Sequence, residues 1–345
     1  MNVQLQPLPP ASPTVFADGP RLLADIGGTN ARFALETAPG QIGLIEVLPC
    51  ASHATLADAL RAYLALPALA AAGSGAIRHA AIAIANPVLG DSVRMTNHHW
   101  QFSISALRQE CRFETLIVEN DFSALARALP HLGAHQKRQV GGGSARGHSA
   151  LGLLGAGTGL GVSGLIPCAG GWSALSSEGG HVTFSPANDT EIAILRFAWG
   201  EFEHVSAERL LSGDGLELSY RALAHHTGQP DLQLGAAEIS RRALAAECPL
   251  CDQVVEAFCG MLGTVAGNLA VTLGAQGGIY IGGGIVPRLG ERFASSSFRR
   301  RFEQKGRFVH YLAQVPTWVI TADYPAFLGV SAILSEKLSA TTGAS

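Results

Sequence analysis

Two polar residues, Asn120 and Asp121, stand between the apolar run LIV (116–118) and FSALARAL, whose apolar residues recur at helical spacing until Pro130. A carboxylate at this position could accept the proton of a substrate hydroxyl as a general base. Asn and Asp also cap helices, because their side-chain oxygens accept otherwise unpaired backbone N–H groups. Taken alone, the segment favours capping over catalysis. Glu119, directly before the pair, has no role that the sequence supports.

Three glycine-rich turns are the second chemical feature. They are Asp25-Ile26-Gly27-Gly28-Thr29-Asn30, residues 155–161 (GAGTGLG, with Gly157, Thr158 and Gly159 at its centre), and Gly282-Gly283-Gly284. Backbone N–H groups of such turns can point into one concavity that suits phosphate oxygens, and Asp25 could hold Mg²⁺ through water. The third turn could let a flat nucleoside lie against the backbone. The alternatives are a tight hairpin for the first turn and close strand–helix packing for the third.

Two nucleotide-binding motifs are excluded. Residues 159–164 match GxGxxG, but the chain continues in a strand-like pattern to Ile166 and leaves no room for the helix that a dinucleotide fold requires. No GxxxxGK[ST] occurs, so the chain is not a P-loop enzyme.

A third group of residues suits a polyol. Glu178 and His181 lie in EGGH, and Glu208 begins a helix in SAERLLSG. Sugar hydroxyls donate and accept hydrogen bonds, so carboxylates, amides and imidazoles are suitable partners. Each residue also has a structural alternative: an exposed turn for Glu178, a strand histidine for His181 and a first-turn helix acid for Glu208. Together with the glycine turns, they indicate phosphoryl transfer to an alcohol.

The elements that must position these residues alternate between strands and helices, which predicts an α/β protein with a mixed sheet in each lobe. Residues 21–35 and 150–167 both read as strand, Gly/Thr turn, strand, and this repeat suggests a duplicated core. We expect further strands at 79–86, 93–97 and 277–281. Helices are expected at 55–72 (interrupted near Pro67), 103–111, 208–228 (broken at 212–215), 252–275 and 285–293.

Composition narrows the class of protein. The 345 residues are 47% hydrophobic and 15% charged, with a net charge of -3, so they indicate a globular protein without a nucleic-acid surface. Six scattered cysteines favour reduced thiols in a cytoplasm, and the one CxxC, Cys248 to Cys251, lacks the further ligands of a zinc site, so neither a metal nor a redox role is favoured there. Residues 1–20 read as a disordered extension rather than a signal peptide, and no membrane span is expected.

Eight motifs in order resemble the bacterial glucokinase family. They are LLADIGGTNARFAL, IANPVLGDSVRMTNHHW, ENDFSALA, LLGAGTGLGVSGLIP, SSEGGHVTFSP, AERLLSGDGL, GGIYIGGGIVPR and FEQKGRF, which together span about residues 21–336. Within the last motif, a surface charge cluster is favoured over a phosphate contact for Lys305 and Arg307. The resemblance implies a two-lobed, actin-like (ribonuclease H-like) fold with a central cleft. It also implies ATP-dependent phosphorylation of the 6-hydroxyl of glucose in glycolysis, with Mg²⁺, by a homodimer.

The resemblance implies roles residue by residue. Asp121 would be the general base, and Asn120, Glu178, His181 and Glu208 would bind sugar hydroxyls. Nucleotide and phosphate contacts would come from Asp25, Gly27, Gly28, Thr29, Asn30, Gly157, Thr158, Gly159, Gly282, Gly283 and Gly284. The small lobe would hold residues 21–131 and 322–345, and the large lobe 132–321. Alternatives are a kinase of another hexose or amino sugar on the same fold, and a non-catalytic sugar-sensing regulator.

Overall fold

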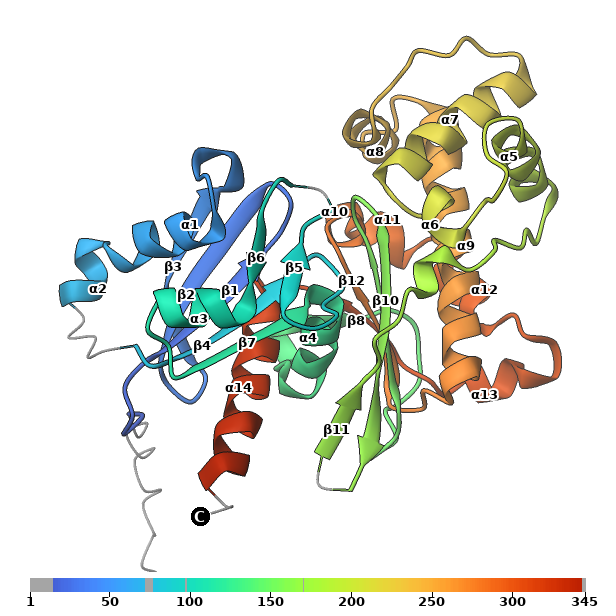
Figure 1. Ribbon diagram of the computed structural model, residues 1–345. Coiled ribbons are helices and arrows are strands. Elements are labelled where there is room, and N and C mark those ends of the chain that lie inside the picture. Colours follow the sequence, from blue (N-terminus) through green and yellow to red (C-terminus); the bar gives the residue numbers. More distant parts are fainter. Residues whose placement is uncertain (1–14, 72–76, 97, 170, 343–345) are drawn as a thin grey trace, which may run out of the picture. The chain divides into compact units, whose positions relative to one another are not determined.

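A computed structural model describes residues 15–71, 77–96, 98–169 and 171–342 (Figure 1). The chain divides into two compact units: unit 1 comprises residues up to 124 and from 326 onward, and unit 2 comprises residues 125–325. Of the expected N-terminal extension, residues 1–14 lie outside the described residues. Residues 15–20 are part of unit 1: Phe16 N donates to the carbonyl of Thr37 at 3.4 Å, and the guanidinium of Arg21 lies over the Phe16 ring.

Unit 1 is built on a five-stranded mixed sheet in the order β3-β2-β1-β4-β7. Strand β1 is antiparallel to β2 and parallel to β4, and β4 is parallel to β7. The strands are β1 (Arg21–Ile26), β2 (Asn30–Ala38), β3 (Gln41–Pro49), β4 (His79–Ile84) and β7 (Thr115–Asn120), and a separate small sheet pairs β5 (Ser92–Arg94) with β6 (Gln101–Ser103). Because β1, β4 and β7 are parallel, their carboxyl ends meet at one edge of the sheet.

Helices cover both faces of this sheet. The unit contains α1 (Leu56–Leu64), α2 (Pro67–Ala71), α3 (Ile104–Glu110), the first half of α4 (Asp121–Ala128) and α14 (Ala326–Thr342). Apolar side chains of α1 and α3, such as Leu60 and Leu107, pack with alternate residues of β1 and β4. Helix α14 lies on the other face (Figure 1). Its residues Phe327 and Leu334 pack with Leu23 and Ala81. Strands β1 and β4 are buried almost throughout because a core covers each face of the sheet.

Unit 2 contains a six-stranded sheet in the order β11-β10-β9-β12-β13-β8. Its strands are β8 (Lys137–Gln139), β9 (Leu151–Ala156), β10 (Leu160–Cys168), β11 (Gly171–Ala174), β12 (Gly278–Gly282) and β13 (Thr317–Ile320). An antiparallel set, β11-β10-β9, continues into the parallel set β9-β12-β13, as β3-β2-β1 continues into β1-β4-β7. The shared topology confirms the duplicated core that the two hairpins predict.

Helices of unit 2 gather around α9 (Pro249–Leu273), which packs against α5, α7, α8, α12 and β9. The others are α5 (Asp189–Trp199), α6 (Ala207–Leu210), α7 (Gly213–Thr227), α8 (Ala236–Leu244), α10 (Ile285–Leu289), α11 (Glu291–Ala294), α12 (Phe298–Glu303) and α13 (Val309–Ala313). Short 3₁₀ turns are η1 (Cys50–Ser52) in unit 1 and η2 (Leu129–His131), η3 (Ala134–Gln136), η4 (Gly179–His181) and η5 (Gly306–Phe308) in unit 2. Glycines at 260, 263 and 267 form the small-residue face of α9 and allow α12 to approach closely.

Helix α9 is also, among the described residues, the one helix whose length and composition would suffice to cross a membrane. Of its apolar window, 61% is buried inside the protein. Extensive burial of this kind is typical of a core helix.

Local expectations hold for most elements, with one difference. The helix expected at 208–228 is interrupted where predicted: α6 ends at Leu210, and Ser212 caps α7 by accepting from Gly215 N at 3.2 Å. The single helix expected at 285–293 is wrong, because it is two short helices. Gly290, with φ 54° and ψ -125°, interrupts the helix between α10 and α11.

Candidate functional site

Residues that the sequence singled out in unit 1 lie at the carboxyl edge of its parallel strands. Ile26, Ile84 and Asn120 are register partners across β1, β4 and β7. The first glycine turn follows β1 directly, and Asp121 follows β7 directly. In open α/β sheets, this edge is where ligands bind.

Asn120 is the N-cap of α4. Its Oδ1 accepts from Ser123 N at 3.1 Å and from Phe122 N at 3.0 Å, which satisfies two N–H groups that the helix leaves unpaired. Its Nδ2 points back to the loop after β4 and donates to the carbonyl of Asn86 at 3.4 Å. The capping role considered for the Asn-Asp pair therefore belongs to Asn120.

Asp121 occupies the first position of α4. Its Oδ1 accepts from Phe122 N at 2.9 Å and from Asn120 Nδ2 at 3.2 Å. The carboxylate is thus oriented by neighbouring groups, at a helix N-terminus that suits a negative charge. A general base requires a carboxylate held in one orientation.

The first glycine turn joins β1 to β2. Gly27 N donates to the carbonyl of Asn30 at 3.0 Å, and η1 secures the turn because Cys50 N donates to the carbonyl of Thr29 at 2.8 Å. Within the described chain, the N–H groups of Gly28 and Thr29 have no hydrogen-bond acceptor. Two neighbouring donors of this kind suit an anion such as phosphate.

Asp25 and Arg32 face each other across the antiparallel β1–β2 pair, with Oδ2 and Nη1 2.9 Å apart. Burial raises the pKa of Asp25 above its ordinary value, although the charge of Arg32 opposes that shift. A single carboxylate fits Mg²⁺, which keeps several waters and takes its other ligands from substrate phosphates. The sequence analysis did not identify Arg32, although an acidic and a basic residue on either side of a hairpin tip could have indicated its pairing with Asp25.

The second glycine turn, in unit 2, is closed in a similar way. Gly157 N donates to the carbonyl of Gly159 at 2.8 Å, and Gly213 N, at the start of α7, donates to the carbonyl of Gly157 at 2.9 Å. In the described part of the chain, no acceptor pairs with the N–H groups of Thr158 or Gly159. Both hairpins of the duplicated core therefore offer two unpaired donors.

Glu208 lies beside this second turn. Its Oε2 accepts from Leu160 N at 2.8 Å, and its Oε1 lies 3.8 Å from Nε2 of His181. A Cβ on Gly159 would come within 2.5 Å of Oε2, so glycine is what lets the carboxylate reach the turn. The structure therefore brings Glu208 and His181 together next to Gly159.

Glu178 precedes the 3₁₀ turn η4 and His181 is its last residue, and His181 N donates to the carbonyl of Glu178 at 3.0 Å. Both side chains are exposed. Gly180 between them is buried against β10: a Cβ there would lie 2.0 Å from the carbonyl oxygen of Leu160. The EGGH segment is thus fixed to the strand that leaves the second glycine turn.

The third glycine turn follows β12. Gly283 has φ +81°, and a Cβ there would lie 2.2 Å from the carbonyl oxygen of Ala156, so packing against β9 accounts for this glycine. Gly284 has only the Arg288 side chain within 4 Å of such a Cβ, and Gly282 lies in register with Gly155. Space beside the backbone is therefore available at Gly284 and not at Gly283.

Lys305 has a structural contact. Its Nζ donates to the carbonyl of Thr264 on α9 at 3.4 Å, and burial lowers its pKa. Arg307 is exposed. Asn86 was missed as a partner of Asn120, although an Asn-Pro pair after an apolar strand marks such a turn.

Comparison with known proteins gives the family of the chain that carries these residues. A family model described as Glucokinase matches residues 22–337. The chain belongs to the glucokinase family. It is 55% identical over 320 residues to a protein named "Glucokinase" from Chromobacterium violaceum, which covers 93% of this chain and 90% of the relative. Among solved structures, a glucokinase from an Antarctic psychrotroph matches with a TM-score of 0.84 and 38% identity over 92% of this glucokinase-family chain and 99% of that chain.

Several relatives of this glucokinase-family chain are longer. A protein named "Bifunctional protein glk" from Paraburkholderia xenovorans is 59% identical over 333 residues, which are 95% of this chain and 51% of the relative. The chain thus spans about half the length of the first curated relatives that it matches. The fold of the glucokinase family agrees with the two duplicated sheets described above.

Proposed function

We propose that this chain is a glucokinase, which transfers the γ-phosphoryl group of ATP to the 6-hydroxyl of D-glucose. The observation that carries the proposal is the family match over residues 22–337, which contains every residue of the candidate site. Relatives from Chromobacterium violaceum and Neisseria gonorrhoeae that carry the name "Glucokinase" are 55% and 50% identical over nearly their whole length. We propose further that it acts in glycolysis, in the cytoplasm and as a homodimer.

In this proposal, Asp121 accepts the 6-hydroxyl proton as the oxygen attacks the γ-phosphorus. The hydrogen bonds that Phe122 N and Asn120 Nδ2 donate to its Oδ1 support this role, because they hold the carboxylate in one orientation. Asn120, Glu178, His181 and Glu208 bind the other sugar hydroxyls. The contact between Glu208 and the second glycine turn supports a coupling between sugar and phosphate binding.

Phosphates of ATP would bind the unpaired N–H groups of residues 28–29 and 158–159, with Gly27, Asn30 and Gly157 shaping these turns, and Gly282 to Gly284 would contact the nucleoside. Asp25 would hold Mg²⁺ through water. When bound, the ion neutralises charge on the transferring phosphoryl group. Unpaired backbone donors support this assignment, because they attract anions without any side chain.

Asp121→Asn and Asp121→Ala test the role of the general base. We expect kcat to fall by about 10²–10⁴-fold, as is typical when a general base is lost, while glucose affinity stays within about tenfold. Coupled ADP release would give kcat, and tryptophan fluorescence or calorimetry would give the affinity for glucose.

Asp189 offers a matched control, because Asn188 and Asp189 begin α5 as Asn120 and Asp121 begin α4. Asp189→Ala should leave kcat unchanged. Turnover of Asp121→Asn close to that of the unsubstituted chain would refute the assignment. A panel of mannose, fructose and glucosamine, each with ATP and Mg²⁺, would decide between glucose and another sugar as substrate.

A further inference from the structure

Two cysteines at the start of α9 have no part in the proposed kinase site. Cys248 is the N-cap of the helix, Pro249 is its first residue and Cys251 lies in its first turn. The Sγ of Cys248 accepts a hydrogen bond from Cys251 N at 3.4 Å. This contact folds the first thiol back over the residue that carries the second.

The two thiols differ in exposure and in acidity. Cys248 is half-buried and reachable from solvent, whereas Cys251 is fully buried. Burial acts against ionisation of Cys248, but hydrogen bonds from Cys251 and from Leu250 N, together with the charge of Arg242, lower its pKa below the ordinary value. Burial raises the pKa of Cys251 to about 12, and the neighbouring Cys248 adds to that shift. A reachable thiol with a lowered pKa beside a buried thiol is typical of reactive CxxC pairs.

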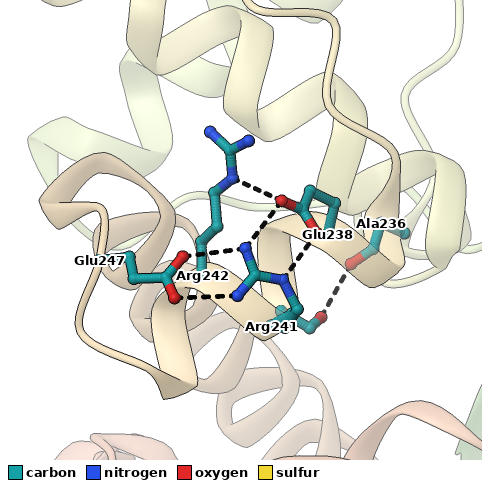
Figure 2. A network of polar contacts seen from close by, with 6 residues as sticks. Ala236, Glu238, Arg241, Arg242 and Glu247 are labelled. Carbon is teal, nitrogen blue, oxygen red and sulfur yellow. Dashed lines mark hydrogen bonds and ion pairs between the residues drawn. The ribbon is translucent and has the colours of Figure 1, made fainter.

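A network of charged residues fixes the chain that leads into this pair (Figure 2). Glu238 on α8 accepts from Arg242 Nε at 2.7 Å and from Arg241 Nε at 2.8 Å. Arg241 also donates to Glu247, the residue before Cys248, at 2.8 Å and 3.0 Å. The network therefore fixes Glu247, the residue before Cys248, and holds the guanidinium of Arg242 against Glu238.

We propose that Cys248 and Cys251 form a redox-active dithiol, which exchanges with a low-molecular-weight disulfide to form an intramolecular disulfide. The thiolate of Cys248 attacks one sulfur of the small disulfide, so that an S–S bond forms to Cys248 and one small thiolate leaves. The Cys251 thiol then attacks the Cys248 sulfur, and the second small thiolate leaves and takes up the proton that Cys251 releases. The dithiol is oxidised by two electrons, and the small disulfide is reduced to two thiols.

Neighbouring groups support this assignment over a metal site. Within the residues that the structure describes, no group of three His, Cys, Asp or Glu side chains could hold a metal ion. Cys259, two turns further along α9, is buried away from solvent. The sequence pattern alone did not favour a redox role, and what changes the interpretation is the position of the pair at a helix N-terminus, with one thiol accessible and the other buried.

The test uses the full chain, reduced with dithiothreitol, freed of reductant and then equilibrated in mixtures of reduced and oxidised glutathione. After acid quenching and alkylation, intact mass and peptide mapping should show a loss of two hydrogen atoms and a loss of alkylation at Cys248 and Cys251 together. In the reduced protein, Cys248 should react with iodoacetamide faster than the exposed Cys168. This comparison needs no variant, so it stands even if a substitution impairs folding.

Variants separate the two steps. Cys251→Ser should stop at a stable mixed disulfide of glutathione with Cys248, whereas Cys248→Ser should form neither species at residue 251. Cys168→Ser, as the matched control, should still form the intramolecular disulfide. The proposal is overturned if the unsubstituted chain stops at the mixed disulfide, if the disulfide involves Cys259 instead, or if Cys248 reacts no faster than Cys168.

Discussion

Oε2 of Glu208 accepts a hydrogen bond from the backbone N–H of Leu160 at 2.8 Å, although the two residues are 48 positions apart. Leu160 begins β10 directly after the second glycine turn, so the carboxylate bonds to the strand that shapes the turn. One side chain thereby joins a proposed sugar contact to a proposed phosphate contact. Substitutions of Glu208 should therefore affect more than the affinity for glucose.

Glu208→Ala should lower the free energy of unfolding by about 1 kcal/mol, because the N–H of Leu160 loses its acceptor. It should also raise KM for both glucose and ATP. Glu208→Gln keeps an acceptor oxygen and should raise KM for glucose alone, at unchanged stability. Urea unfolding and steady-state kinetics on both variants check this, and equal effects of the two variants on KM for ATP would contradict it.

Gly159→Ala tests the same contact between Glu208 and the second glycine turn by changing the turn. The new Cβ would lie 2.5 Å from Oε2, which forces the Glu208 carboxylate to move while its charge is kept. We expect KM for glucose to rise by about tenfold or more, as when a charged hydrogen bond is lost. Gly157→Ala is the control for stability, because no atom lies within 4 Å of its added Cβ. A normal KM for glucose in Gly159→Ala would show that Glu208 acts without that contact.

Comparing Asn120→Ser with Asn120→Ala separates the two proposed roles of Asn120, which are helix capping and sugar binding. Asn120→Ala should reduce the free energy of unfolding by about 1 kcal/mol, because α4 loses its cap. Asn120→Ser can still cap the helix and should be nearly as stable as the unsubstituted chain, yet it is too short to reach a sugar hydroxyl. KM for glucose should therefore rise in both variants. If Asn120→Ser restores glucose affinity together with stability, Asn120 is only a cap.

Asp25 should leave a signature in the pH dependence of stability. Its pKa in the folded state is raised by burial, above the value of about 3.9 in an unfolded chain, so the folded state holds the proton more tightly. The contribution of Asp25 to the free energy of unfolding is fully present below the unfolded-state pKa and is lost as pH rises through the folded-state pKa. The difference in unfolding free energy between the unsubstituted chain and Asp25→Asn should therefore fall as pH rises across that range. Urea unfolding at matched pH values measures it, and a rising difference would show that the pair with Arg32 dominates.

Gly283 and Gly284 provide a contrast within one turn. Gly283→Ala should destabilise the protein by more than about 1 kcal/mol, because φ is +81° and the Cβ would lie 2.2 Å from the carbonyl oxygen of Ala156. Gly284→Ala should fold normally. If the third turn contacts the nucleotide, Gly284→Ala should raise KM for ATP without changing KM for glucose. An unchanged KM for ATP would remove Gly284 from the nucleotide site.

Much of the fold was predictable because its signals are local. Fully apolar runs such as 80–84 mark buried parallel strands, and Ser212 with three small or turn-forming neighbours marks the break between α6 and α7. The edge strands β8 and β11 were missed, as was β13 between β12 and β8, since each has only three or four residues. The break at Gly290 was missed because apolar spacing continues across it.

The candidate site was also predictable only in part. Residue types and motifs indicated Asp121, Glu208 and His181, but spacing along the chain cannot reveal that Glu208 binds Leu160 N or that Arg32 opposes Asp25. Such contacts depend on strand register and on which loops meet. The CxxC was visible in the sequence, whereas the burial of one thiol and the exposure of the other depend on how α8 and α9 pack.

Helix α14 has a consequence for the order in which the chain can fold during synthesis. It supplies half of one core of unit 1, and it is bound there by hydrogen bonds from Arg21 to Ser335 and from Ser331 to Glu36, both at 2.8 Å. Its residues leave the ribosome only after the 201 residues of unit 2, which are contiguous in the chain (125–325). Unit 2 can therefore complete its structure co-translationally, while the sheet of unit 1 keeps an apolar face uncovered until α14 emerges. During that interval, the nascent chain exposes apolar residues of the sheet, such as Leu23 and Ala81, that α14 later covers.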